Sequence, residues 1–238
     1  MKNFIQKVVS SLLAFPSLLI LAQLPEALLA IPQKFLESIT EDQPVLRVLI
    51  FLPIFCVSST LSNSLSFLLV LQHAENKRPS LPNAFSILKN RLPQVLLAYL
   101  VILAFFILAA MGLYLLILPA LYFMAIYQFT PYLILTSEKM PLFAVLHRSQ
   151  KMVRSSWMRL LNAMCLILSS IAMGIATYFA GQQLGELSTA LTTNTLLQGV
   201  SSTTIDIFFS IIGGSIVSVV ISHFFLNLRA QVNHEGSR

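Results

Sequence analysis

The sequence predicts an all-α, polytopic membrane protein in which six transmembrane helices are joined by cytoplasmic amphipathic helices. Three observations predict this fold class. Of the 238 residues, 56% are hydrophobic and 10% are charged, whereas about a quarter of the residues in a soluble domain are charged. The hydrophobic residues form runs long enough to cross a bilayer, which takes about 20 residues per helix. The basic residues lie between these runs, where they orient a chain in the membrane.

Six spans are predicted within a single membrane domain, residues 1–238. They cover residues 8–31, 46–72, 94–112, 117–136, 161–180 and 205–228. The first span follows two lysines and so has the charged start of a signal peptide. Its apolar part is longer than the roughly 7–15 residues of a signal peptide, and no A-x-A cleavage site follows it. We therefore expect a retained helix, interrupted by Pro16 and Pro25.

The second span carries a stripe of polar side chains that includes Ser58, Ser62 and Ser66. In lipid, hydroxyl groups need partners on their own helix or on a neighbouring one. The stripe is therefore expected to face other helices rather than lipid.

The third and fourth spans follow from the uncharged run at residues 94–135. This run is about twice as long as one helix that crosses roughly 30 Å of hydrocarbon. We expect a tight turn between Gly112 and Pro119. We also expect a kink at Pro131, because proline lacks a backbone N–H.

The connections between spans are predicted from their polar and small residues. Residues 73–93 form a polar connection in which 83–92 make a short helix, and residues 181–204 are expected to form a loop. Small residues recur every four positions in spans five and six and predict helix-packing seams. They are Ala172, Ala176 and Ala180 in span five, and Ser210, Gly214, Ser218 and Ser222 in span six.

The distribution of basic residues predicts the orientation of the chain. With the N-terminus in the cytoplasm, 13 of the 15 Lys and Arg residues lie on the cytoplasmic side, and only Lys34 and Arg47 lie outside. The 13 are Lys2, Lys7, Lys77, Arg78, Lys89, Arg91, Lys139, Arg148, Lys151, Arg154, Arg159, Arg229 and Arg238. Both termini are therefore predicted to be cytoplasmic. Orientation also explains the net charge of +6 without a nucleic-acid partner.

Residues 141–160 have the pattern of an amphipathic helix. At 100° per residue, the basic side carries Arg148, Lys151, Arg154 and Arg159. The apolar side carries Leu142, Val145, Leu146, Met152, Val153, Trp157 and Leu160. A helix of this type lies in the membrane interface and attracts anionic headgroups. The four basic residues are thus the predicted lipid-headgroup site, although a cytoplasmic connector that orients the spans has the same pattern.

The sequence contains no recognisable catalytic motif. Its four histidines are scattered, and none has the H-E-x-x-H spacing of a metal hydrolase. It also lacks the G-x-S-x-G motif and a phosphate-binding glycine loop. His223, near the cytoplasmic end of span six, is expected to contact water. No catalytic residue, cofactor or metal site is predicted.

One part of the chain resembles a known family. The residues that carry the resemblance are Leu118-Pro119, the run Tyr127–Leu135 (YQFTPYLIL), Glu138-Lys-Met and the segment Arg148–Trp157. With them, residues 56–165 resemble the YciC-like uncharacterised inner-membrane proteins and the related membrane domain fused to some glycerophosphodiester phosphodiesterases. The family has Pro-Gly where this chain has Pro119-Ala120. The resemblance implies a multi-pass protein of the bacterial inner membrane and implies no catalytic residues.

Two functions are consistent with these features. The first is a non-enzymatic membrane protein that binds or organises lipids, with anionic headgroups as partners, or partner proteins. The second is a transporter or channel for a lipid-like or neutral solute that uses the polar stripe of span two. A membrane-embedded enzyme ranks third. A sealed, packed stripe would favour the first function, and a water-filled stripe the second.

Overall fold

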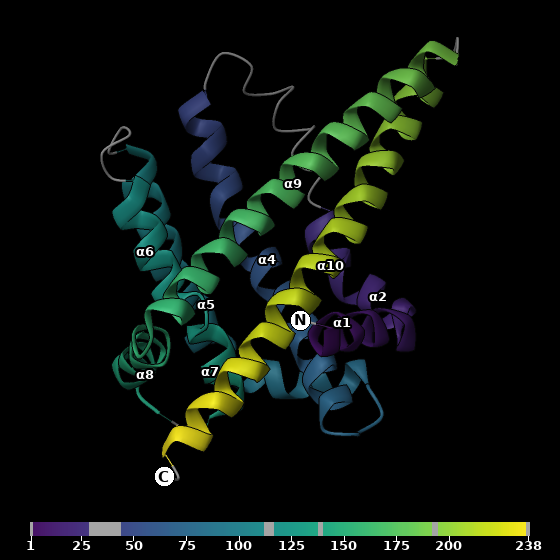
Figure 1. Ribbon diagram of the computed structural model, residues 1–238. Coiled ribbons are helices and arrows are strands. Elements are labelled where there is room, and N and C mark those ends of the chain that lie inside the picture. The colour runs from purple at the N-terminus through teal and green to yellow at the C-terminus, as the bar shows by residue number, and fades with distance from the viewer. Residues whose placement is uncertain (1, 29–43, 112–116, 138–139, 192–194, 237–238) are drawn as a thin grey trace.

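The computed structural model describes residues 2–28, 44–111, 117–137, 140–191 and 195–236 (Figure 1). Every regular element in these residues is an α-helix, as the sequence predicts. The helices are α1 (Lys2–Ala14), α2 (Pro16–Ala27), α4 (Pro44–Ala74), α5 (Leu81–Met111), α6 (Ile117–Tyr127), α7 (Thr130–Thr136), α8 (Leu142–Arg154), α9 (Trp157–Leu191) and α10 (Thr195–Gly236).

Three helices are long and apolar enough to cross a membrane. The candidate spans are Leu81–Ala104 in α5, Trp157–Glu186 in α9 and Thr203–His234 in α10. Helices α1 and α2 together make a fourth candidate, but they meet at a bend of 85°. The described part of the chain therefore contains three to four candidate spans, fewer than the six predicted.

The first predicted span, residues 8–31, forms two helices, and its residues 29–31 lie outside the described residues. It is divided at Phe15, whose backbone leaves the helical region with φ −146° and ψ 53°. Pro16 is the physical cause, because its ring crowds the preceding residue and it cannot donate a helical hydrogen bond. Pro25 lies inside α2 and does not end it.

Helix α4 matches the second predicted span and is followed by a tight connection to α5. Asn76 adopts a left-handed conformation with φ 56°, which asparagine tolerates better than most residues. The Asn76 and Lys77 N–H groups donate to the His73 and Gln72 carbonyls at 3.0 and 2.8 Å, which is the Schellman arrangement of a helix C-terminus. The short helix predicted at residues 83–92 is present, but it is continuous with the third span in α5.

The fourth predicted span, residues 117–136, is also divided. Helix α6 ends at Tyr127, and α7 begins at Thr130 with Pro131 in its first turn. The expected effect of Pro131 is therefore confirmed, but as a break between two helices. Arg91 of α5 donates to the backbone carbonyls of Ile134 and Ser137 at the C-terminal end of α7, where a cation complements the helix dipole. Of the expected turn, residues 112–116 lie outside the described residues.

The predicted loop at residues 181–204 is wrong. Helix α9 continues to Leu191 and α10 begins at Thr195, so almost all of this segment is helical. Its glycines each disfavour a helix by only about 1 kcal/mol, and packing between the two long helices is a larger effect. Figure 1 shows α9 and α10 side by side next to their connection, and they separate toward α8.

Aromatic side chains form the core where α4, α7 and α10 meet. The ring of Phe67 lies 4.5 Å from Tyr132 and 5.5 Å from Phe225, measured between ring centroids. Phe129 lies 5.9 Å from Phe225, and all four side chains are buried. Contacts between aromatic rings stabilise a core by more than the burial of their apolar surface alone would. Most of the run Tyr127–Leu135, which carries the family resemblance, is thus packed into the core.

Candidate functional site

Glycines allow α9 and α10 to approach closely over one half of their length. A Cβ atom added at Gly213 would lie 2.8 Å from Thr177 Cγ2, and one at Gly181 would lie 3.3 Å from Asp206 Oδ1. Both distances are shorter than an ordinary contact, so larger residues would push the helices apart. The seam predicted at Ala172 and Ala176 is wrong, because both side chains are exposed.

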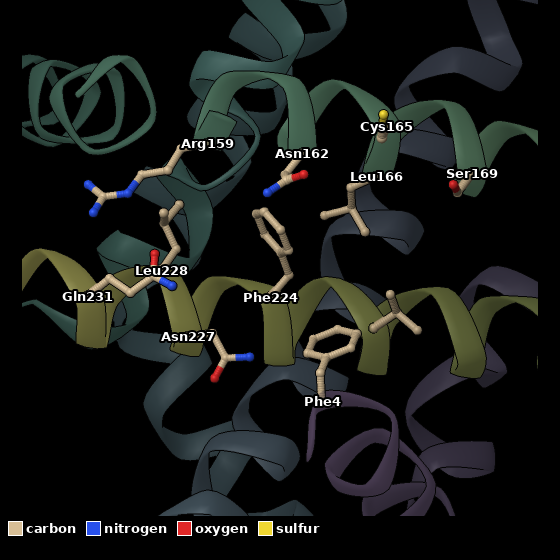
Figure 2. A pocket seen from close by; sticks show the side chains of 11 residues that line it. Phe4, Arg159, Asn162, Cys165, Leu166, Ser169, Phe224, Asn227, Leu228 and Gln231 are labelled. Atoms are coloured by element: carbon tan, nitrogen blue, oxygen red, sulfur yellow. The ribbon is translucent and has the colours of Figure 1, made fainter. Parts of the chain in front are cut away.

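Over the other half of their length, α9 and α10 lie farther apart, and a pocket lies between them (Figure 2). Its volume is about 530 Å³, which is within the range of about 300–1,000 Å³ for small-molecule pockets. Helices α1, α9 and α10 contribute to it. The lining residues are Phe4, Arg159, Asn162, Cys165, Leu166, Ser169, Val220, Phe224, Asn227, Leu228 and Gln231.

The two ends of the pocket differ in chemistry. Figure 2 shows Arg159 and Gln231 together at one end, while Leu166 and Ser169 lie toward the other. Arg159 Nη1 donates to Ser155 Oγ at 2.6 Å, so the short segment between α8 and α9 helps to orient the guanidinium. Phe4 reaches the apolar part from α1. The pocket is therefore amphipathic along its length.

The four predicted headgroup residues lie on two helices rather than one. Arg148, Lys151 and Arg154 are exposed on α8, while Arg159 lies in the first turn of α9. The expectation of one helix over residues 141–160 is wrong, because the chain leaves the helical conformation at residues 155–156. Of the four, Arg159 lines the pocket.

The apolar side of α8 contacts other helices of the protein. Val145, Met152 and Val153 are buried, and α8 packs against α6, α7 and α9. Ser149 Oγ donates to the Ile126 carbonyl at 2.6 Å, which attaches α8 to α6. The side chain of Phe143 is 84% exposed and that of Trp157 is 71% exposed. The large apolar side chains of this segment that stay exposed are therefore Phe143, Trp157 and Met158.

A second polar feature lies between the helices, where Gln23, Ser66 and Ser218 are buried and Asn63 is half-buried. Gln23 Nε2 of α2 donates to Ser66 Oγ of α4 at 2.9 Å and to Ser218 Oγ of α10 at 3.1 Å. Ser218 Oγ donates to Asn63 Oδ1 at 2.8 Å. We call Gln23, Asn63, Ser66 and Ser218 the Gln23 cluster. It joins α2, α4 and α10 in one hydrogen-bonded network.

The Gln23 cluster explains the polar stripe of the second span. Ser62 and Ser66 are fully buried, and Ser62 Oγ accepts a hydrogen bond from the Glu26 N–H at 3.1 Å. The expectation that the stripe faces other helices is thus confirmed for these residues, while Ser58 is half-buried. Gly214 is also at a helix contact as predicted, since a Cβ there would lie 2.6 Å from Gln23 Oε1.

His223 is buried, and the expected contact with water is wrong. Its Nε2 lies 2.8 Å from Ser11 Oγ, and the two residues join α1 to α10. The position of His223 along the span does not reveal whether another helix covers that side of α10, so the sequence could not predict its burial. No sequence motif marks Ser11 or Gln23, although each is a polar residue in an apolar run, where it needs a partner.

The buried polar groups are not all satisfied. Among the described residues, five buried atoms have no hydrogen-bond partner: Thr60 Oγ1, Ser64 Oγ, Gln72 Nε2, Thr130 Oγ1 and Ser215 Oγ. No group of three or more His, Cys, Asp or Glu residues in the described ranges is arranged to hold a metal ion. The described residues thus form an amphipathic pocket between α9 and α10 and a largely buried polar network.

The fold and these two features define an all-helical protein whose long apolar helices can cross a membrane. Comparisons with protein-family models, with curated proteins and with solved structures give no match. The resemblance to the YciC-like family therefore stays a prediction.

Proposed function

We propose that this chain is a non-enzymatic, multi-pass inner-membrane protein that binds and organises membrane lipids. The observation that carries the proposal is the amphipathic pocket between α9 and α10, with Arg159 at its polar end and apolar side chains beyond it. A lipid has the same order of groups along its length. The exposed basic residues of α8 add favourable electrostatic attraction to an anionic membrane surface, worth about 1 kcal/mol each.

The transporter alternative is less well supported. It requires the polar stripe of α4 to line a water-filled passage, but Ser62 and Ser66 are buried and hydrogen-bonded. Hydrogen bonds of this kind between membrane helices are common devices for packing. The stripe therefore supports assembly of the helices better than it supports movement of a solute.

The proposal includes six membrane crossings with both termini in the cytoplasm. The crossings are α1 with α2, then α4, α5, α6 with α7, α9 and α10. Helix α4 has 31 residues and is about 46 Å long at 1.5 Å per residue, which exceeds the roughly 30 Å of hydrocarbon. The basic residues of the segments between crossings support this orientation by the positive-inside rule.

Native mass spectrometry of the purified, full-length protein tests the lipid-binding function. We expect bound phospholipid after gentle delipidation. We also expect added phosphatidylglycerol to raise the melting temperature, because a ligand that binds only the folded state stabilises it. A protein that retains no lipid, and whose melting temperature does not respond to phosphatidylglycerol, would contradict the proposal.

A further inference from the structure

The polar end of the pocket has donors that suit a phosphate group. Arg159 carries a planar guanidinium with five N–H donors, a geometry that matches the oxygens of a phosphate group. Gln231 of α10 lies on the same side of the pocket as Arg159 of α9 (Figure 2), and the amides of Asn162 and Asn227 also line the pocket. An anionic group between Arg159 and Gln231 would therefore lie between the two helices.

The part of the pocket away from Arg159 carries apolar side chains that suit a hydrocarbon chain. Leu166 of α9 and Val220 and Phe224 of α10 line it, and Phe4 of α1 covers one side (Figure 2). An acyl chain can pack against these side chains as it packs against other lipid tails, because both surfaces are apolar. A hydrocarbon chain beside α9 also remains continuous with the lipid around the exposed apolar side chains of that helix, such as Leu168 and Ile171.

We propose that this pocket binds one anionic phospholipid, with its phosphate at Arg159 and one acyl chain between α9 and α10. This inference rests on the lipid-binding function proposed above and assigns the site and the headgroup class. The positive charge of Arg159 favours an anionic headgroup, and the apolar side chains beyond it favour an acyl chain. Inorganic phosphate alone leaves the apolar end empty and binds weakly.

The chain carries its own reporter for occupancy of the pocket. Cys165 is exposed and lines the pocket, whereas Cys56 is buried. In a Cys56→Ala background, the rate of Cys165 alkylation by N-ethylmaleimide in detergent measures the accessibility of this thiol, which a lipid in the pocket should lower. We expect phosphatidylglycerol to slow this reaction at concentrations where phosphatidylcholine with the same acyl chains does not, and inorganic phosphate to have no effect.

Two arginine substitutions give a matched comparison. Arg159→Gln removes the charge at the pocket, and we expect it to raise the phosphatidylglycerol concentration needed for half-protection by about fivefold or more. Arg78→Gln removes an exposed charge from the connection between α4 and α5, away from the pocket lining, and should leave that concentration unchanged. The lipid-free melting temperatures of both variants serve as the control for folding.

The outcomes separate this inference from the proposed function. Equal protection by the two phospholipids, or an unchanged concentration in Arg159→Gln, would overturn the assignment of the pocket. If native mass spectrometry still finds bound lipid in that case, the lipid-binding function stands and its site lies elsewhere. If the wild-type protein retains no lipid at all, both proposals fail. A Phe4→Ala variant that weakens binding of phosphatidylglycerol would support the position of the acyl chain.

Discussion

Single polar residues in apolar helices determine which helices of this protein contact one another. Gln23 is fully enclosed and donates to serines on two different helices, and Gly214 provides the space for its side chain. An amide without partners would be costly to place in a bilayer, since lipid provides no hydrogen-bonding groups. The position of Gln23 therefore favours one arrangement of α2, α4 and α10 over others with similar apolar contact.

The space beside Gly214 leads to a stability prediction. Gly214→Leu should lower the free energy of unfolding by about 1–3 kcal/mol, because a larger side chain overfills the contact with Gln23. Gly174→Leu is the matched control, since a Cβ at Gly174 meets no atom within 4 Å. Thermal melting of both variants in detergent makes the comparison. If Gly214→Leu melts like the wild type, Gln23 does not occupy that contact.

The bond between Gln23 and Ser66 can be measured by a double-mutant cycle. Gln23→Leu and Ser66→Ala should each reduce stability, and the double variant should lose less than the sum of the two. The expected coupling is about 0.6 kcal/mol and at most about 1.7 kcal/mol, as for other hydrogen bonds between membrane helices. Gln23 paired with the exposed Ser86 of α5 should show no coupling. An additive result for Gln23 and Ser66 would indicate that the two side chains act independently.

At the level of whole helices, some prolines coincide with a break in the helix and others lie within a continuous helix. Pro16 and Pro131 each follow a break between two helices, whereas Pro53 and Pro93 lie inside continuous helices. Each of these prolines removes one hydrogen-bond donor from its helix, so this loss alone does not explain the difference. Whether the helix breaks depends on whether the neighbouring helices hold the segment straight. Helix α8 shows the same influence of its surroundings, because α6 and α7 cover its apolar side.

The two sides of α8 should respond differently to substitution. Met152→Ala removes a buried side chain and should destabilise the protein by about 2–5 kcal/mol. Phe143→Ala removes an exposed one and should change stability in detergent by less than about 0.5 kcal/mol. Melting of the purified variants checks this difference. Equal effects would mean that α8 does not dock on α6 and α7 as the structure places it.

For the whole molecule, the long helical hairpin of α9 and α10 is the largest feature that extends beyond the core. Helix α10 has 42 residues and is about 63 Å long, twice the thickness of the hydrocarbon layer. Large apolar side chains on α9, including Ile175, Tyr178 and Phe179, are exposed. Such a surface is stable in lipid and would be a liability in water.

Reporter fusions test the orientation of the whole chain. The positive-inside rule predicts cytoplasmic signals after residues 75, 140 and 232, and external signals near residues 40 and 190. A periplasmic signal at residue 140 would contradict the six-span topology. A cytoplasmic signal at residue 40 would show that the bent pair α1 and α2 enters and leaves the membrane on the same side.

The sequence by itself determined the all-helical class, the proline positions at which a helix can bend or break, and the need of the serines in α4 for helix partners. These features follow from composition, from the covalent structure of proline and from the cost of an unpaired hydroxyl in lipid, all of which act locally. Arg159 was also predicted to bind headgroups from its position on an amphipathic pattern, although that role is still a prediction.

Only the tertiary structure decided which side chains meet. It places Arg159 at a pocket and its three predicted companions on another helix, and it buries His223 against Ser11. It also makes residues 181–191 helical, because helix packing outweighs the weak helix propensity of small and polar residues. Periodicity reveals the apolar side of a helix but not its neighbour, since lipid and protein are equally apolar partners in a membrane.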